Sequence, residues 1–316
     1  MDKFGKNISE LKKQLSLSSI EFSNTEKLKN LNSDAIIIIG MGGSGQIGDI
    51  IAGLKKDLNL TVPIMCWKNW SLPTTSFKNP LYIFVSFSGN TEETLSGFTN
   101  TNGIKAIVAS DGKLLKIAKE NKIPAAYFKN SGIKPRQGNG LMFSAVLGLL
   151  TKAFPIVKID NINLKNYEKK GKSIAQKIKN KTIIIYVSEN NNFLAYNWKT
   201  RINENSKVPA FSGIIPEICH NEIEIFENKK FKKESIVLFL KDKNDNKEII
   251  SRLEKIKKIF KFNKINFLEI ELEGKNNIEK TWNSLALADW TSYYLAKLSK
   301  IDPTENKLID DLKKLK

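Results

Sequence analysis

Residues 35–54 read AIIIIGMGGSGQIGDIIAGL, and this stretch decides the fold class. Its first part, 35–40, is an uninterrupted apolar run rich in β-branched residues, which is typical of a strand that a parallel sheet buries on both faces. The glycines that follow predict a tight turn, and the residues after them predict a helix. A buried strand that passes into a helix through a glycine-rich turn indicates an α/β fold.

The alternation of strand and helix continues along the chain. Further apolar runs predict strands at 63–67, 81–89, 104–110, 123–128, 182–189, 235–242 and 265–272. Helical patterns cover 90–98, 113–121, 140–154, 192–207, 246–260 and 281–300, and the polar segment 1–33 also has a helical, amphipathic pattern. Strands that alternate with helices predict doubly wound parallel sheets. A polar stretch after Pro155 separates two similar halves, so we predict domains at 1–155 and 156–316.

The composition fits a protein with two ordinary hydrophobic cores. The 316 residues are 41% hydrophobic and 27% charged, which indicates a globular chain of about two domains. No apolar run reaches the roughly 20 residues of a membrane span, and the N-terminus lacks the apolar core of a signal peptide. Two isolated cysteines, Cys66 and Cys219, suit a reducing cytoplasm and form neither a zinc site nor a disulfide framework.

The net charge of +18 raises the question of nucleic-acid binding. The lysines are spread along the chain, however, and no zinc-finger pattern, RNA-binding aromatic motif or basic helix stands out. We therefore expect no nucleic-acid partner. A positive field of this size would still help to gather a small anionic substrate.

The turn GMGGSG (40–45) matches the dinucleotide-binding pattern G-x-G-x-x-G. That pattern also requires an acidic residue about 20 positions further on, at the end of the next strand, where it binds the ribose. Here the next strand ends in MCWKNW, without Asp or Glu. The glycine pattern alone is therefore weak evidence for a dinucleotide site. A phosphate-binding P-loop is excluded, because no lysine follows the glycines.

A second turn, SFSGNTEET (86–94), gives a sharper signal. Ser86, Ser88 and Thr91 place three hydroxyls at the start of a helix, where backbone N–H groups and the helix dipole attract a phosphate. An ordinary N-cap would need only one of them. In a parallel sheet, two such turns at neighbouring strand ends form one crevice, where ligands of this fold class bind.

Together these motifs resemble the sugar isomerase (SIS) domain, which binds phosphosugars. The resemblance continues through KPRQGNG (134–140), RINENSK (201–207), PEICHNEIE (216–224) and DWTSYYLAKLSKIDP (289–303). This series is similar to the bifunctional phosphoglucose/phosphomannose isomerases, which carry two SIS domains. It implies two doubly wound αβα sandwiches of flavodoxin-like type.

The family also implies a set of binding residues. The hydroxyl-rich turn of the first domain holds the sugar phosphate, a role that falls to Ser86, Ser88 and Thr91. Gly43 and Ser44 line the same site.

The resemblance further implies four catalytic residues. Arg136 stabilises an enediolate, and Glu204 is the base that moves a proton between C1 and C2. His220, the only histidine, helps to open the sugar ring and is contributed by the second subunit of a homodimer. The family's lysine in the last long helix has Lys297 as its nearest match, with Tyr294 as the alternative.

Other interpretations of these residues remain open. Glu204 lies one helical turn from Arg201, which alone would suggest a surface ion pair. His220 is flanked by Glu217, Glu222 and Glu224, which suit an ion-paired surface histidine equally well. A small residue of the last long helix is thought to admit the mannose epimer, and Thr291 is in that neighbourhood.

The leading hypothesis is a cytoplasmic aldose–ketose isomerase that uses no cofactor and no metal. It would interconvert glucose 6-phosphate with fructose 6-phosphate through a cis-enediol, and mannose 6-phosphate is the second candidate substrate. One alternative is an SIS enzyme for another phosphosugar. The other is a non-catalytic SIS regulator, although the segment before residue 35 is too short for the usual DNA-binding domain.

Overall fold

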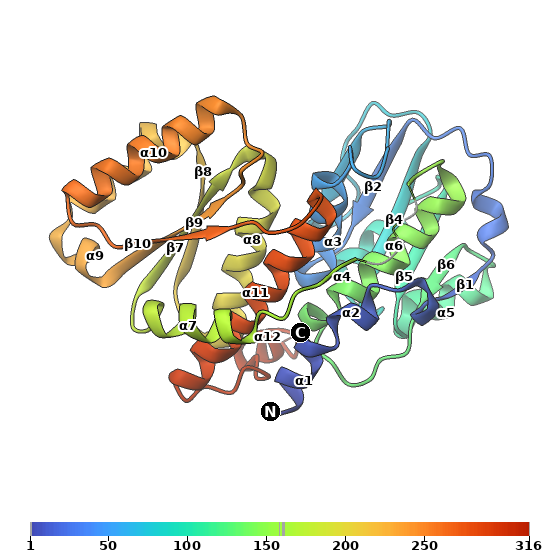
Figure 1. The fold of residues 1–316 in the computed structure, drawn as a ribbon. Helices are drawn as coiled ribbons and strands as arrows, with labels where there is room; N and C mark the ends of the chain where they lie inside the picture. Colours follow the sequence, from blue (N-terminus) through green and yellow to red (C-terminus); the bar gives the residue numbers. More distant parts are fainter. Residues whose placement is uncertain (1, 158, 160–161, 316) are drawn as a thin grey trace. The chain divides into compact units, whose positions relative to one another are not determined.

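The computed structural model describes residues 2–157, 159 and 162–315. They form two compact units, and Figure 1 shows the chain coloured along its sequence. The N-terminal unit is Ser9–Ile162, and the C-terminal unit is Asn163–Lys316 together with Met1–Ile8. The sequence prediction placed the boundary after residue 155 and assigned residues 1–8 to the first domain, so the observed units differ from it in both respects.

The N-terminal unit is built on a six-stranded sheet in the order β1-β6-β5-β4-β2-β3. Five strands are parallel, and β1 pairs antiparallel with β6 at one edge. The strands are β1 (Glu21–Ser23), β2 (Ala35–Ile39), β3 (Ile64–Trp67), β4 (Pro80–Ser86), β5 (Lys105–Ala109) and β6 (Ala125–Tyr127). The parallel-sheet prediction for this half is confirmed.

Helices cover both faces of this sheet. The helices are α3 (Gly42–Gly53) and α6 (Asn139–Ala153) on one face, and α4 (Glu92–Thr99) and α5 (Gly112–Glu120) on the other. Successive strand residues alternate between the two layers, so Ile37 and Ile39 pack with Phe98 of α4. All of β2 is buried, which explains why its sequence is an unbroken apolar run.

The first 33 residues are less helical than the sequence predicted. Their elements are α1 (Lys3–Ser9), α2 (Leu11–Gln14), the 3₁₀ turns η1 (Leu17–Ser19) and η2 (Thr25–Leu28), and the edge strand β1. β1 is only three residues long, which is too short for a period of two to be visible in the sequence. Its pairing with β6, through Phe22 and Ala126, decides its conformation.

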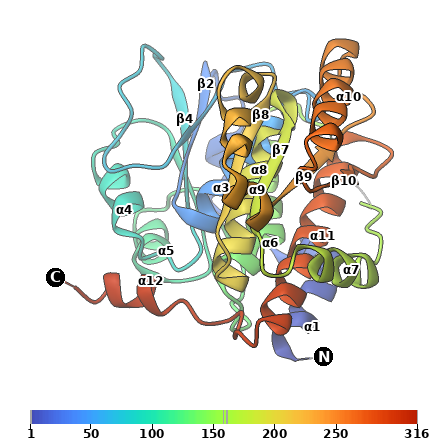
Figure 2. The ribbon, with the colours of Figure 1, turned by 90° about the vertical axis from the view of Figure 1, so that its left-hand side faces the viewer.

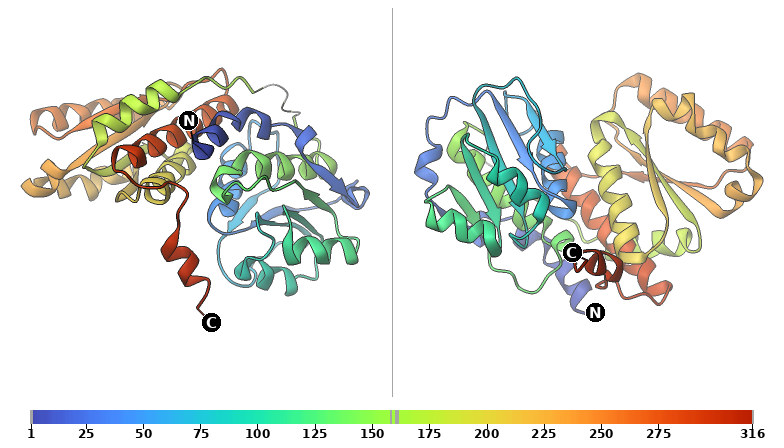
Figure 3. Two further views of the ribbon diagram at one scale, coloured as in Figure 1. Left: turned by 90° about the horizontal axis from the view of Figure 1, so that it is seen from below. Right: turned by 180° about the vertical axis from the view of Figure 1, so that it is seen from behind.

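The C-terminal unit is built on four parallel strands in the order β10-β9-β7-β8. They are β7 (Thr182–Ser188), β8 (Ala210–Ile215), β9 (Ser235–Lys241) and β10 (Phe267–Glu271). One face packs against α7 (Glu168–Ile178), α8 (Asn192–Arg201) and α11 (Asn277–Leu298). The other face packs against α10 (Lys247–Phe262) and two 3₁₀ segments, η6 (Glu217–His220) and η7 (Glu222–Glu227). The two layers of helices on either side of these strands are visible in Figure 3.

Short elements complete the second unit. They are the 3₁₀ turn η4 (Glu189–Asn191), the π-helical segment η5 (Ile202–Ser206), α9 (Lys229–Glu234) and α12 (Lys307–Leu312). The N-terminal unit has one more short element, the 3₁₀ turn η3 (Pro135–Gln137). α12 follows the long helix α11 and extends away from the sheet of its own unit (Figure 2).

Helix α7 and strand β8 are two elements of the C-terminal unit that do not appear in the sequence prediction. The segment of α7 is rich in Lys and Glu, but its few small and apolar residues, Gly171, Ile174, Ala175 and Ile178, share one buried face. β8 has the mixed sequence AFSGII and becomes a strand through its pairing with β7. The tertiary contacts of both elements outweigh a weak local pattern.

Both sheets share one arrangement of their parallel strands. Numbered in chain order within each unit, the parallel strands follow the order 2-1-3-4, with a fifth strand in the N-terminal unit. This is the flavodoxin-like order that the resemblance implied. The strand order reverses between β2 and β4 in one sheet and between β7 and β9 in the other. Ligands of such folds bind outside the carboxyl ends of the strands at this reversal.

Gly171 of α7 tests the packing that sequence reasoning missed. A Cβ added there would lie 2.5 Å from Trp290 Cβ and 2.9 Å from the Thr291 backbone nitrogen on α11. We expect Gly171→Ala to lower the free energy of unfolding by about 1–3 kcal/mol through overpacking, as measured by urea denaturation. Gln176→Ala, on the exposed face of the same helix, is the matched control, and an equal effect of both would contradict this packing.

The thiol of Cys66 on β3 gives a prediction about its rate of alkylation. Its sulfur would lie 3.0 Å from a Cβ at Gly48 of α3, and burial, with the neighbouring Asp49 charge as the second cause, raises the pKa of Cys66 to about 12. Only the thiolate reacts with alkylating agents, and at pH 8 it would be roughly one part in ten thousand. In a Cys219→Ser variant, we therefore expect iodoacetamide to label the native protein at least about a hundredfold more slowly than the urea-unfolded protein. Equal rates would show that the thiol is not held in this environment.

Candidate functional site

The first glycine-rich turn joins β2 to α3, beside the reversal of strand order. Gly42 has a φ of 51°, a left-handed conformation that glycine adopts without strain. A Cβ at Gly40 would lie 2.7 Å from the carbonyl oxygen of Val85 on β4. The glycines therefore allow the turn to lie directly against the neighbouring strand.

The second turn joins β4 to α4 on the other side of the reversal. Gly89 has a φ of 67°, and a Cβ there would lie 1.8 Å from the Asp111 carbonyl oxygen. Thr91 is the N-cap residue of α4 but makes no side-chain capping hydrogen bond. Its hydroxyl instead lies 2.9 Å from that of Ser86. An ordinary N-cap therefore does not account for the hydroxyls of this turn.

Ser44 connects the two turns. Its hydroxyl accepts a hydrogen bond of 3.0 Å from the backbone N–H of Phe87 and faces the sulfur of Met142 at 3.4 Å. Ser88, by contrast, is exposed at the turn, and its hydroxyl accepts a 3.3 Å hydrogen bond from the Asn90 backbone. The two strand ends are thus held in one fixed arrangement by a buried side chain.

The arginine loop packs onto the first turn. A Cβ at Gly43 would lie 3.1 Å from both the Cα and the backbone nitrogen of Arg136. The side-chain amide of Asn139 donates to the Gly43 carbonyl oxygen at 2.9 Å. The N-terminal unit therefore brings together six of the predicted residues, which are Gly43, Ser44, Ser86, Ser88, Thr91 and Arg136.

Lys68 is a residue beside this site that sequence reasoning did not select. It follows the end of β3, where a dinucleotide-binding protein would carry an acid. Its side chain forms an ion pair with Asp49 of α3, and its Cγ would lie 3.2 Å from a Cβ at Gly45. This lysine could have been selected from the sequence, because MCWKNW has it where a dinucleotide-binding protein would have an acid. It places a cation next to the glycine-rich turn.

In the C-terminal unit, Glu204 lies in a π-helical segment. The sequence predicted one helix over 192–207, but the α-helix ends at Arg201 and η5 follows it. Lys207, with a φ of 55°, ends the segment, and Asn205 donates a 2.9 Å hydrogen bond to Ser292 of α11. π-helical turns are rare, and they occur frequently at functional sites.

Arg201 is not the surface residue that a simple ion pair with Glu204 would require. Its side chain is 2% exposed, and its Nε donates to Asp289 of α11 at 2.8 Å. A terminal nitrogen also donates to the Asn197 side chain at 2.7 Å. Arg201 therefore fastens the end of α8 to α11, one turn before Glu204.

His220 is exposed at the end of η6, which follows β8. The three carboxylates around it behave differently. Glu217 accepts a 2.7 Å hydrogen bond from Asn221, and Glu224 is exposed. Glu222 is partly buried, and burial raises the pKa of its carboxyl group.

The candidates of the last long helix have separate partners. Lys297 lies 2.5 Å from Asp2, whose carboxylate raises the pKa of the lysine. Tyr294 donates a 2.6 Å hydrogen bond to Glu168 of α7, and burial together with this bond raises its pKa to about 12. Thr291 is fully buried, and its hydroxyl has no hydrogen-bond partner within the described residues. Glu204, His220 and Lys297 thus lie on three different elements of this unit.

The strand reversal of the C-terminal unit differs chemically from that of the N-terminal unit. Ser188, at the end of β7, donates a 2.7 Å hydrogen bond to Asp245, and burial raises the pKa of that carboxyl group. Asp242, after β9, forms a buried 2.6 Å ion pair with Lys280. Carboxylates replace the hydroxyl pair here, so this crevice is unsuited to a phosphate.

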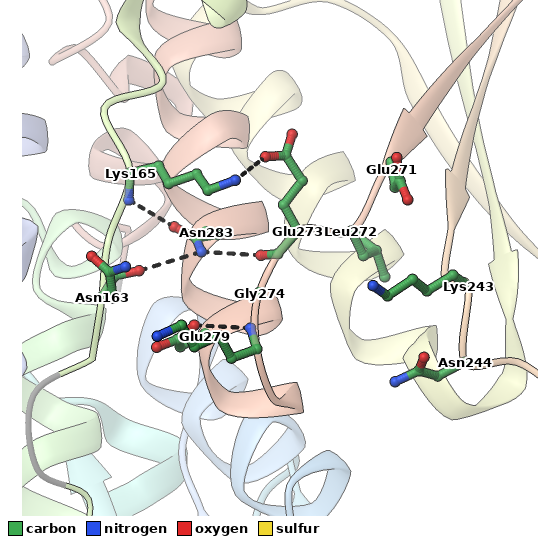
Figure 4. Close-up of a pocket in the computed structure, with 11 residues that line it drawn as sticks. Asn163, Lys165, Lys243, Asn244, Glu271, Leu272, Glu273, Gly274, Glu279 and Asn283 are labelled. Atoms are coloured by element: carbon green, nitrogen blue, oxygen red, sulfur yellow. Dashed lines mark hydrogen bonds and ion pairs between the residues drawn. The ribbon is translucent and has the colours of Figure 1, made fainter.

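A pocket of about 720 Å³ lies in the C-terminal unit near the ends of β9 and β10 (Figure 4). Lys165 forms a 2.6 Å ion pair with Glu273 in it, and Asn283 donates to the Glu273 carbonyl oxygen at 3.0 Å. Residues of both charges line it, and none of the predicted site residues does.

Two further properties follow from a search of residues 2–157, 159 and 162–315. No group of three or more His, Cys, Asp and Glu side chains in these ranges could hold a metal ion. No helix in them is both long enough and apolar enough to pass through a membrane.

Comparison with known proteins identifies the family. Residues 167–315 match the bacterial phospho-glucose isomerase C-terminal SIS domain. A bifunctional phosphoglucose/phosphomannose isomerase from Aquifex aeolicus is 34% identical over 285 residues, which are 88% of this chain and 89% of the relative. A D-glucosamine-6-phosphate 4-epimerase from Sulfolobus acidocaldarius is 30% identical over 63% of this chain and 66% of its own length.

A solved structure shows the same fold at low identity. The tagatose-6-phosphate ketose/aldose isomerase of Escherichia coli superposes with a TM-score of 0.67 at 14% identity, covering 96% of this chain and 95% of that one. The two flavodoxin-like sheets, the paired turns and the extended similarity to the Aquifex relative agree with one another. The chain belongs to the family of bifunctional phosphoglucose/phosphomannose isomerases.

Proposed function

We propose that this protein is an aldose–ketose isomerase that interconverts glucose 6-phosphate and mannose 6-phosphate with fructose 6-phosphate. The observation that carries the proposal is the pair of turns at the strand reversal of the N-terminal unit. There the Thr91 hydroxyl pairs with Ser86 instead of capping its own helix. The similarity to the Aquifex isomerase over 88% of the chain supports the choice of reaction.

The phosphate role falls to the hydroxyl-rich turn. A phosphate at the start of α4 would meet backbone N–H groups at the positive end of the helix dipole. Thr91 and Ser88 can turn their hydroxyls toward it, while Ser44 keeps the two turns together through its bond to Phe87. The net charge of +18 favours the approach of a dianion.

The chemical role falls to residues that handle protons and developing negative charge. Glu204 acts as the base that removes the proton from C2 of the open-chain aldose and returns it to C1, which gives the ketose. The enediolate formed between the two steps is stabilised by the guanidinium of Arg136, which can bind two oxygen atoms at once. No redox cofactor is required, because the oxidation of C2 is balanced by the reduction of C1.

Ring opening precedes the proton transfer, and it requires an acid–base group. His220 suits this role, and its exposed position would allow it to act on the active site of a second subunit in a homodimer. Lys297 is proposed as a positively charged partner, because Asp2 raises its pKa and keeps it protonated.

A second candidate function is 4-epimerisation of a phosphosugar. The 30% identity to the D-glucosamine-6-phosphate 4-epimerase covers 63% of the chain. A comparison of glucosamine 6-phosphate with fructose 6-phosphate as substrates distinguishes the two. Formation of the 4-epimer without any aldose–ketose turnover would favour the epimerase.

The direct test is a coupled assay of the purified protein with fructose 6-phosphate. We expect glucose 6-phosphate to form, and mannose 6-phosphate in a parallel assay with the appropriate coupling enzyme. Absence of both products, from protein that is folded by circular dichroism, would refute the proposed function.

Thr91→Val tests the phosphate turn. The loss of one hydrogen bond to a charged group should raise KM for fructose 6-phosphate about 10- to 100-fold, with a smaller effect on kcat. Inorganic phosphate should also inhibit the variant more weakly than the wild type. Thr99→Ala is the control, since the Thr99 hydroxyl bonds only to its own helix at the far end of α4. Unchanged kinetics of Thr91→Val would remove this residue from the site.

Glu204→Gln tests the base. Removal of a general base costs about 10²- to 10⁴-fold in rate, so we expect kcat to fall by that factor while KM changes little. Exchange of the C2 proton of glucose 6-phosphate in D₂O, followed by NMR, should stop as well. Glu189→Gln, an exposed change before α8, should keep normal exchange. Persistent exchange in Glu204→Gln would assign the base elsewhere.

A further inference from the structure

Glu222 stands out among the carboxylates near His220 because it points into the protein. The 3₁₀ segments η6 and η7 meet at Asn221, whose side chain accepts a 2.5 Å hydrogen bond from the Glu222 backbone N–H. On either side, Ile218 and Phe226 are 2% exposed and belong to the core between the sheet and α10. His220 therefore projects outward from a segment that is anchored at both ends.

The Glu222 carboxylate occupies the space above a glycine of β8. A Cβ at Gly213 would lie 2.8 Å from Oε2 of Glu222, 2.5 Å from Ile218 Cγ2 and 2.9 Å from Cε1 of Tyr186. These distances place the carboxylate against the aromatic ring, on the core face of the sheet. Any larger residue at position 213 would displace it.

Tyr186 provides a buried polar group for this carboxylate. It lies on β7, has no exposed surface, and its hydroxyl makes no hydrogen bond of ordinary geometry within the described residues. The carboxylate of Glu222 and the ring of Tyr186 both lie next to the point above Gly213. Burial, with the charge of this carboxylate as the second cause, raises the pKa of the tyrosine. A buried hydroxyl without a hydrogen-bond partner is costly, and the carboxylate of Glu222 is a nearby polar group that could accept a hydrogen bond from it.

The carboxylate at this position also has a cost in stability. Burial raises the pKa of Glu222, so the ionised form is less stable in the folded protein than in water. An apolar residue of similar size would fill the same space without this cost, although it would leave the Tyr186 hydroxyl without a polar neighbour. Charged groups kept at a cost in stability are typical of functional sites.

We propose that Glu222, through the Tyr186 hydroxyl, is a positioning residue that fixes the segment carrying His220 in the conformation needed for ring opening. The inference rests on the role of His220 in the proposed function. Glu222 does not touch the substrate; it acts by holding the backbone of 217–222 against the sheet, so that the imidazole two residues away keeps one direction.

A double-mutant cycle tests the inference. We expect Glu222→Ala to lower kcat with glucose 6-phosphate at least about tenfold, with KM within about twofold of the wild type. In a His220→Ala background the same change should lower kcat less than about twofold further, because the group it positions is absent. Glu222→Gln should retain most of the activity, since its amide oxygen could still accept a hydrogen bond from the tyrosine hydroxyl.

A substrate that cannot close its ring separates positioning from general damage. Proton exchange at C2 of a tetrose 4-phosphate needs no ring opening, so Glu222→Ala should leave its rate within about twofold of the wild type. Glu224→Ala, an exposed change in the same segment, should affect neither substrate. If Glu222→Ala does not fold, Tyr186→Phe removes only the hydroxyl and should lower kcat with glucose 6-phosphate without lowering Tm.

The outcomes distinguish this inference from the function on which it rests. Equal losses from Glu222→Ala in the wild-type and His220→Ala backgrounds, or normal kcat in both Glu222→Ala and Tyr186→Phe, would overturn the positioning role alone. Full activity of His220→Ala would refute the assigned role of the histidine, and the inference with it.

Discussion

The reversal of strand order between β2 and β4 is the constraint on which the N-terminal unit depends. At this point the connections from two neighbouring strands leave in opposite directions, toward α3 on one face and α4 on the other. The turns at the strand ends therefore diverge and leave a place for a ligand. The buried hydroxyl of Ser44, which accepts from the Phe87 backbone, sets the distance between them.

The C-terminal unit has the same strand order and a different chemistry at its reversal. Where the N-terminal unit has the Ser86–Thr91 hydroxyl pair, the C-terminal unit has Asp245 and the Asp242–Lys280 ion pair. A buried ion pair of this kind is a fixed structural element, because the loss of either partner leaves an uncompensated charge. The two units thus have the same strand order but different proposed roles. The first unit suits a phosphate, and the second carries Glu204 and His220 on the elements around its sheet.

The proposed catalytic residues of the second unit are held by neighbours that sequence motifs do not mark. Arg201 joins the end of α8 to Asp289 of α11 just before the π-helical turn of Glu204. Ile218, Glu222 and Phe226 attach the segment of His220 to the core beneath it. In both cases packing holds in place the segment that carries the side chain proposed to transfer a proton, which is what proton transfer at a defined distance requires.

Much of this protein could be predicted from its sequence. The apolar run before GMGGSG indicated a buried parallel strand, because it is short, rich in β-branched residues and followed by a glycine-rich turn. SFSGNTEET indicated an anion site through its excess of hydroxyls. The alternation of elements gave two α/β halves, and the motif series gave the family. Each of these properties depends on residues that are close together in the chain.

Only the tertiary structure decided the rest. The edge strand β1, the helix α7 and the strand β8 form because partners distant in sequence complete them, as Trp290 does for Gly171. The spacing of Arg201 and Glu204 left a surface ion pair open as an alternative, and it gave no sign that Arg201 is buried and bonds to Asp289 on α11. Nothing in the sequence separates Glu222 from the other carboxylates near His220. Burial and partner choice are set by contacts between distant segments, so no local pattern of residues contains them.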